Sequence, residues 1–168
     1  MTEKNMDEIK KIMVAIAFSE HAKSIFNYAA KLAVSLNAEL LVVSIINSRD
    51  VEAVESISAM GYDVDAEHYV RNIRNERNEI LEQIIGESGF PRERIHTLIT
   101  VGNPIDELLN ITAKEQADMI VMGTKGRTNL TNILIGSVAE KIFRKSPVPV
   151  LSYRDEKHID SKSSIADY

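Results

Sequence analysis

Two hydrophobic patterns alternate along this chain. Short apolar runs rich in β-branched residues have the length of strands, whereas the segments between them repeat apolar residues at the three- and four-residue spacing of amphipathic helices. The strand-like runs cover residues 11–17, 40–46, 95–101, 119–122 and 148–153. The helical pattern follows Ser19 and recurs over residues 65–86, 104–116 and 137–145.

Polar residues at the starts of two predicted helices support these assignments. Ser19 is an expected cap for the first helix. Asn103 precedes Pro104, and Asp106 follows in the first turn, which are favoured positions for all three residue types. Because near-continuous apolar strands alternate with helices, the strands are expected to be parallel and covered on both faces. Right-handed crossovers then predict a single-domain α/β fold, a doubly wound five-stranded parallel sheet with order 3-2-1-4-5.

Two segments lie outside this repeat. Residues 47–63 predict a short helix ending at Gly61, which is either a surface excursion or a lid or partner surface. Residues 154–168 are polar and rich in Ser, Asp and Lys, and they predict a disordered tail. The expected domain therefore covers residues 1–153.

Composition narrows the function classes. The chain has 168 residues, no cysteine and a formal net charge of −5, which disfavours nucleic-acid binding and excludes disulfides and thiolate chemistry. The histidines lack metal-ligand spacing, so no metal site is expected. No apolar stretch is long enough to cross a membrane and no signal-peptide core follows the N-terminus, so we expect a cytoplasmic protein without a membrane partner.

Glycine is scarce but clustered. The chain has seven glycines where average usage predicts about twelve, and Gly123, Gly126 and Gly136 fall within one short segment. This segment follows the fourth strand and leads to Ser137 at the start of the last helix, so backbone N–H groups can approach an anion there. Lys125 and Arg127 add positive charge. The glycines could instead only turn the chain, but their combination with Ser137 favours a phosphate site.

Known phosphate-loop motifs do not explain the cluster. Neither GxxxxGK[ST] nor GxGxxG occurs in the chain, which disfavours Walker-type NTPases and simple dinucleotide-binding domains. The spacing Gly123-x2-Gly126-x9-Gly136-Ser137 instead resembles the ATP-binding signature of the universal stress protein family. VGNP at 101–104 and KKIMVAIAFSEHA at 10–22 are also similar to that family. The resemblance covers roughly residues 9–153 and leaves out the excursion at 47–63 and the tail.

This resemblance implies a domain that binds ATP or another adenine nucleotide (AMP or ADP), with Mg²⁺ as a candidate companion ion. It places the base at the backbone of Ile45 and assigns eleven contact positions in all. The implied nucleotide-binding residues are Ala15, Ile16, Ala17, Ile45, Met122, Gly123, Gly126, Arg127, Gly136, Ser137 and Val138. The resemblance further implies a homodimer formed by the edge strand from Val148 to Tyr153.

One position departs from the family pattern. Ala17 stands where ATP-binding members usually have Asp, so a charge-assisted hydrogen bond worth about 1.5–3 kcal/mol is missing. Weaker binding or a preference for a different adenine nucleotide is expected. Arg71, Arg74 and Arg77 alternate with glutamates and predict a solvated helix face.

The leading functional hypothesis is a regulatory or stress-response protein that uses the nucleotide as a conformational ligand, with an unidentified protein as a further candidate partner. No general base or nucleophile is evident in the sequence, so turnover beyond weak ATP hydrolysis is not expected. Two alternatives stay open. One is a slow ATPase or nucleotidyl-transfer enzyme, and the other is a protein-interaction dimer without nucleotide.

Overall fold

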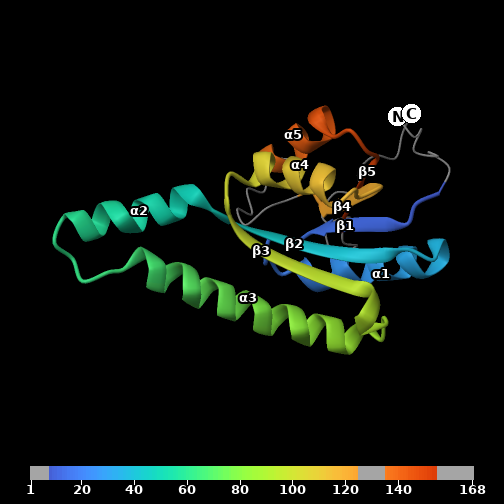
Figure 1. The fold of residues 1–168 in the computed structure, drawn as a ribbon, viewed down its shortest axis with the longest axis horizontal. Coiled ribbons are helices and arrows are strands. Elements are labelled where there is room, and N and C mark those ends of the chain that lie inside the picture. Colours follow the sequence, from blue (N-terminus) through green and yellow to red (C-terminus); the bar gives the residue numbers. More distant parts are fainter. Residues whose placement is uncertain (1–7, 125–134, 155–168) are drawn as a thin grey trace, which may run out of the picture.

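The computed structural model describes residues 8–124 and 135–154, which form an α/β domain with a five-stranded parallel sheet (Figure 1). The strand order β3-β2-β1-β4-β5 confirms the predicted topology. The strands are β1 (Lys11–Ala15), β2 (Glu39–Asn47), β3 (Ile95–Gly102), β4 (Met119–Gly123) and β5 (Val150–Tyr153). The helices are α1 (Ala22–Leu36), α2 (Ser48–Ala59), α3 (Ala66–Ser88), α4 (Pro104–Lys114) and α5 (Ser137–Lys145), with a short 3₁₀ turn at Arg92–Arg94.

Alternation along the central strands produces two apolar cores. Ile12 and Val14 of β1 face the layer formed by α1 and α3, whereas Met13 and Ala15 face α4 and α5. Figure 1 shows the two helix layers on opposite sides of the sheet. Because both faces are covered, the strands are apolar almost without interruption, as a parallel sheet requires.

The helix starts confirm one capping prediction and correct another. The side chain of Asn103 accepts hydrogen bonds from the backbone N–H groups of Ile105 and Asp106 and caps α4. Ser19 does not cap α1, because that helix begins at Ala22 and has no side-chain cap. The Ser19 hydroxyl instead accepts from the backbone N–H of His21, so it stabilises the turn that leads from β1 into the helix.

Two predicted strands are shorter than expected. β1 ends at Ala15 rather than at residue 17, although the backbone N–H of Ile16 still donates to the Val43 carbonyl at 2.9 Å. Ala17 lies beyond the sheet and is exposed. β5 begins at Val150 rather than at residue 148, and the preceding Pro149 has no N–H to donate.

Most of the segment 47–63 forms part of a projecting helical arm. We define the arm as residues 48–76, which comprise α2 and the part of α3 before its first buried residue, Arg77. The arm extends beyond the end of the sheet in Figure 1. α2 has no buried residue, and the predicted end at Gly61 is a left-handed turn (φ +91°) two residues after the helix. The segment therefore contains the predicted short helix, which lies on the surface of the protein.

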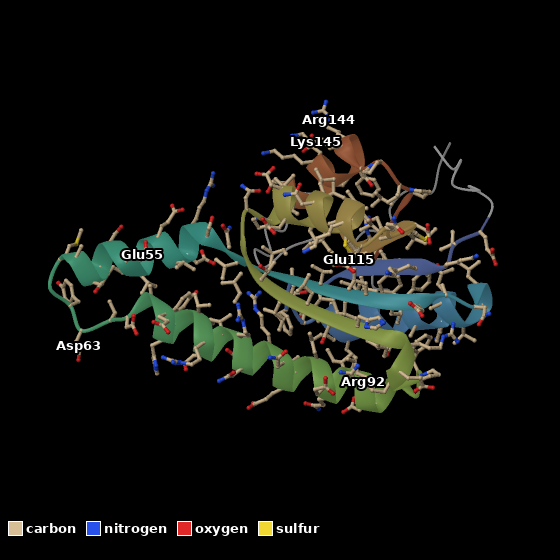
Figure 2. All side chains as sticks on the ribbon, viewed as in Figure 1. Glu55, Asp63, Arg92, Glu115, Arg144 and Lys145 are labelled. Carbon is tan, nitrogen blue, oxygen red and sulfur yellow. The ribbon has the colours of Figure 1, made fainter. Side chains whose placement is uncertain are left out.

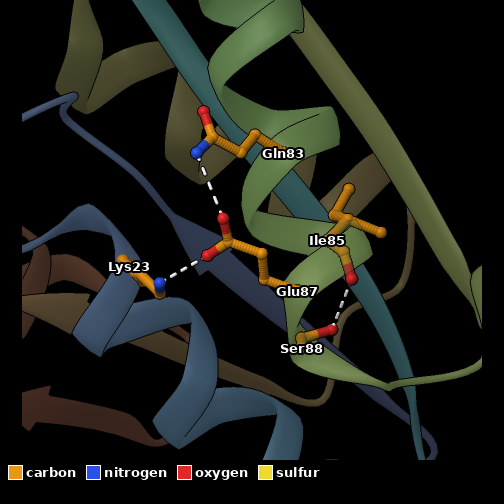
Figure 3. Close-up of polar contacts among 5 residues, drawn as sticks. All are labelled: Lys23, Gln83, Ile85, Glu87 and Ser88. Carbon is orange, nitrogen blue, oxygen red and sulfur yellow. Dashed lines mark hydrogen bonds and ion pairs between the residues drawn. The ribbon is translucent and has the colours of Figure 1, made fainter.

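An ion pair joins α1 to the end of α3. Lys23 Nζ donates to Glu87, and Gln83 Nε2 donates to the same carboxylate at 3.1 Å (Figure 3). The hydrogen bond from Lys23, with the weaker one from Gln83, lowers the pKa of Glu87 below its ordinary value. The ionised carboxylate is thus favoured in the folded state, so this contribution to stability is present above the unfolded-state pKa and is lost as pH falls through the folded-state pKa.

Replacing Lys23 with methionine is therefore expected to raise the titration midpoint of Glu87, as followed by NMR of the side-chain carboxyl carbon. Lys31→Met serves as the control, because Lys31 is also exposed on α1 and makes no contact with Glu87. An unchanged Glu87 midpoint in Lys23→Met would contradict the described pair.

Among the described residues, no helix has both the length and the apolar character that a membrane crossing requires.

Candidate functional site

A cavity of about 360 Å³ opens at the carboxyl ends of β1, β2 and β4. β1 pairs with β2 on one side and with β4 on the other, so the chain leaves the sheet in opposite directions at this point. Open α/β sheets bind ligands at such a switch point, and this volume lies in the range of small-molecule sites. The topology therefore places a candidate ligand site where the sequence predicts one.

The β4 side of the cavity is suited to an anion. Gly123 and Thr124 follow β4, and the backbone N–H of Gly136 donates to the Thr124 carbonyl at 2.7 Å. This hydrogen bond brings both ends of the glycine-rich segment to one place. α5 starts there at Ser137, and the unpaired N–H groups of its first turn carry partial positive charge. Lys125, Gly126 and Arg127 lie outside the described residues.

The cavity brings together nine of the eleven predicted contact residues, which come from β1, β2, β4, α5 and the residues next to them. Apolar side chains of β1, β2 and β4 form part of its wall. The nine are Ala15, Ile16, Ala17, Ile45, Met122, Gly123, Gly136, Ser137 and Val138. Gly126 and Arg127 complete the predicted set and fall in the segment that the structure does not describe.

Arg77 corrects the prediction that its helix face is solvated. It lines the cavity and is only 7% exposed. Its Nη1 donates to the Ser44 hydroxyl at 2.8 Å and to the Ile45 carbonyl at 3.0 Å, and its guanidinium lies 5.2 Å from the centre of the Phe18 ring. The helical spacing could have indicated this burial. Arg77 is four residues before the buried Leu81, so both lie on the same face of α3.

Asp50 and Asn47 also line the cavity, although the sequence reading did not assign them. Both lie where β2 passes directly into α2. The side chain of Asn47 caps α2 by accepting from the Arg49 N–H at 3.1 Å, which puts Asp50 in the first helical turn. Their position at the end of a central strand could have indicated this role, because the carboxyl ends of such strands line the ligand crevice in open α/β sheets.

Within residues 8–124 and 135–154, no cluster of three or more His, Asp or Glu side chains has the geometry of a metal site. The charged residues of the described cavity wall are instead one acid, Asp50, and one base, Arg77.

These features define a doubly wound α/β protein with a cavity at its switch point. The model of the universal stress protein family matches residues 8–154, which is most of the chain. The chain belongs to the universal stress protein family, which confirms the resemblance seen in the sequence.

Individual relatives agree with this assignment. Universal stress protein MJ0577 of Methanocaldococcus jannaschii is 28% identical and covers 84% of this chain and 93% of its own length. Universal stress protein YxiE of Bacillus subtilis is 30% identical, covering 86% of this chain and 98% of itself. The solved structure of MJ0577 superposes with a TM-score of 0.72 at 29% identity, over 88% of this chain and 97% of that one.

A more distant structure shares the fold. It is a universal stress protein in complex with cAMP, with a TM-score of 0.58 and 22% identity, and it covers 88% of this chain and 98% of its own.

Proposed function

We propose that this stress-response protein binds an adenine nucleotide, with ATP as the first candidate, and uses it as a regulatory ligand. The observation that carries the proposal is the meeting of the β4 end with the start of α5, fixed by the hydrogen bond from Gly136 to Thr124. This place borders a cavity that is also lined by apolar side chains at the ends of β1, β2 and β4. That combination suits a ligand with an anionic end and a flat heterocycle.

The described residues fit the two ends of such a ligand. Phosphate groups would lie against Gly136 and Ser137 at the start of α5, where the helix dipole and the hydroxyl favour negative charge. The base would lie between the apolar side chains near Ile16, Ile45 and Met122. Mg²⁺, if it accompanies the nucleotide, would be held mainly by phosphate oxygens and water, which is usual for this ion.

The relative in complex with cAMP supports the ligand class, since cAMP is itself an adenine nucleotide. Because Ala17 offers no acid, the choice among ATP, ADP, AMP and a cyclic nucleotide falls to other groups of the cavity wall.

Two measurements test the proposed function. Small molecules extracted from the freshly purified protein are expected to include an adenine nucleotide identifiable by mass spectrometry. ATP with Mg²⁺ at millimolar concentration is expected to raise the melting temperature of the nucleotide-free protein. No shift with ATP, ADP, AMP or cAMP would overturn the proposal.

We also propose that the protein acts as a homodimer through β5. The described part of β5 pairs with β4 on one side and forms one edge of the sheet. Its residues Val150 and Leu151 are only partly buried. An apolar edge strand promotes pairing with another strand, and a second copy supplies the matching edge.

The dimer is expected to have twice the 18.8 kDa mass of the chain when measured by light scattering after gel filtration. On dilution, amide exchange should accelerate in β5 but not in β3, which is the other edge of the same sheet. A monomeric mass at tens of micromolar, or equal acceleration at both edges, would contradict this interface.

A further inference from the structure

The cavity has a charged side that the anion-binding segment does not explain. Among the described residues that line it, Asp50 is the one acid and Arg77 the one base. Asp50 comes from α2 and Arg77 from α3, so both belong to the helices that build the arm or its base. Both lie with β2, on the opposite side of β1 from β4 and the start of α5. The two sides of the cavity therefore differ in chemistry.

Arg77 is a fixed part of this wall. Its Nη1 donates to two acceptors at the end of β2, the Ser44 hydroxyl and the Ile45 carbonyl, at 2.8 and 3.0 Å. The Phe18 ring covers one face of the guanidinium. These contacts hold the carboxyl end of β2 and orient the guanidinium toward the protein's own carbonyl and hydroxyl groups.

Asp50 is placed by a short, well-defined connection. Asn47 is the last residue of β2 and also the N-cap of α2, so only Ser48 and Arg49 separate the cap from Asp50. The capping hydrogen bond from Arg49 to Asn47 fixes the start of the helix. Asp50 is half-buried and borders the cavity from this first turn.

We propose that Asp50 is a specificity-determining residue, which accepts a hydrogen bond from the nucleoside end of the ligand. This inference rests on the proposed nucleotide binding. An ionised carboxylate only accepts hydrogen bonds and has about four lone-pair sites, so it can receive a ligand donor in addition to its contacts within the protein. It also repels phosphate. A ligand with an anionic end and a donor-bearing end is therefore oriented with its phosphates at α5 and its nucleoside at Asp50.

A nucleoside offers such donors from two sources, the ribose hydroxyls and the exocyclic amine of adenine. Either source has the same chemistry toward Asp50, and Ala17, two residues after β1, supplies no acceptor side chain to compete for it. Asp50, which lies in α2 and not next to β1, thus provides the one carboxylate in the described cavity wall.

The test measures binding of ATP, 2′-deoxyATP, 3′-deoxyATP and ITP by calorimetry, in wild type and in Asp50→Ala. ITP lacks the exocyclic amine, and each deoxy analogue lacks one ribose hydroxyl. Asp50→Ala is expected to weaken ATP binding about tenfold or more, as expected for a lost charge-assisted hydrogen bond. The analogue that lacks the contacted donor should bind wild type more weakly than ATP does and lose little further affinity in the variant.

Glu55→Ala is the matched control, because Glu55 is an exposed acid on the same helix and does not line the cavity (Figure 2). It should leave all four affinities unchanged. Asp50→Asn keeps the side-chain volume and one acceptor oxygen, so it should show the same selectivity change with a smaller loss and provides the measurement if the alanine variant is unstable.

The possible results separate the two proposals. If wild type binds no nucleotide, both are overturned. If wild type binds ATP but Asp50→Ala binds all four nucleotides as tightly, or loses the same factor for all four, the role of Asp50 is wrong and the proposed function stands. Retained affinity in Glu55→Ala together with an analogue-specific loss in Asp50→Ala supports the inference.

Discussion

Replacing Gly136 with valine is expected to abolish the rise in melting temperature that ATP produces in the wild-type protein. Gly136 is the N-cap of α5, and its N–H bonds to the Thr124 carbonyl at 2.7 Å. Its φ of −69° is open to any residue, so the requirement for glycine comes from space rather than from backbone conformation. The branched side chain of valine would fill the place where an anion must approach the first N–H groups of the helix.

The size of the ATP-induced rise in melting temperature follows from the linkage between ligand binding and folding. A ligand at 100 times its dissociation constant adds about 2.7 kcal/mol to the stability of the folded state. For a domain of this size, that corresponds to a shift of about 5–10 °C in melting temperature. Valine is also a poor N-cap, so the ligand-free variant should melt slightly lower than wild type.

Gly86→Val is the matched control for this variant. Gly86 lies in α3 and does not line the cavity, and a Cβ atom added there would meet nothing within 4 Å. It should retain the full ATP-dependent shift. A folded Gly136→Val protein with an undiminished shift would show that the start of α5 does not hold the ligand.

Phe26→Ala is expected to lower the free energy of unfolding by about 3–5 kcal/mol, the cost of truncating a buried aromatic side chain. Phe26 is fully buried in the core formed by α1, α3 and one face of the sheet. Its removal takes away apolar burial and leaves a cavity that neighbouring side chains fill only in part. Since domains are stable by about 5–15 kcal/mol, this one substitution removes a large share of the total.

Urea unfolding followed by circular dichroism measures the effect, with Phe143→Ala as the control. Phe143 lies on α5 and is 42% exposed, so its truncation should cost much less than that of Phe26. Phe26 does not line the cavity, so ATP should still raise the melting temperature of the Phe26→Ala protein. Equal losses for the two phenylalanines would contradict the described packing of α1.

Local pattern was sufficient for the sheet and for much of the candidate site. The five apolar runs and the intervening helices predicted the strand order correctly, because burial on both faces gives each strand a continuous apolar run. The glycine spacing located the segment that follows β4 without any tertiary information. The exact strand ends were not predictable, because β1 and β5 stop where neighbouring strands and turns cease to pair with them.

The burial of Arg77 could not be predicted from the local sequence pattern alone. Among the arginines and glutamates of α3 it looks like one more surface charge, and only the position of the helix against β2 brings its guanidinium to Ser44 and Ile45. These two hydrogen-bond partners lie 33 and 32 positions before Arg77 in the chain, so a local pattern does not contain them. The sequence of α3 shows the helix face on which Arg77 lies, but not the residues of β2 that make its burial favourable.

The sequence by itself determined the order of the elements, the apolar faces that pair them and the glycines that expose backbone near the start of α5. These are local properties, set by side-chain spacing and by the absence of a Cβ atom. Only the tertiary structure decided that α2 and the first part of α3 form a projecting arm and that Asp50 and Arg77 border the same cavity as Gly136. The physical reason is that a cavity wall is assembled from separate strand ends, and its charge depends on which side chains the fold places together.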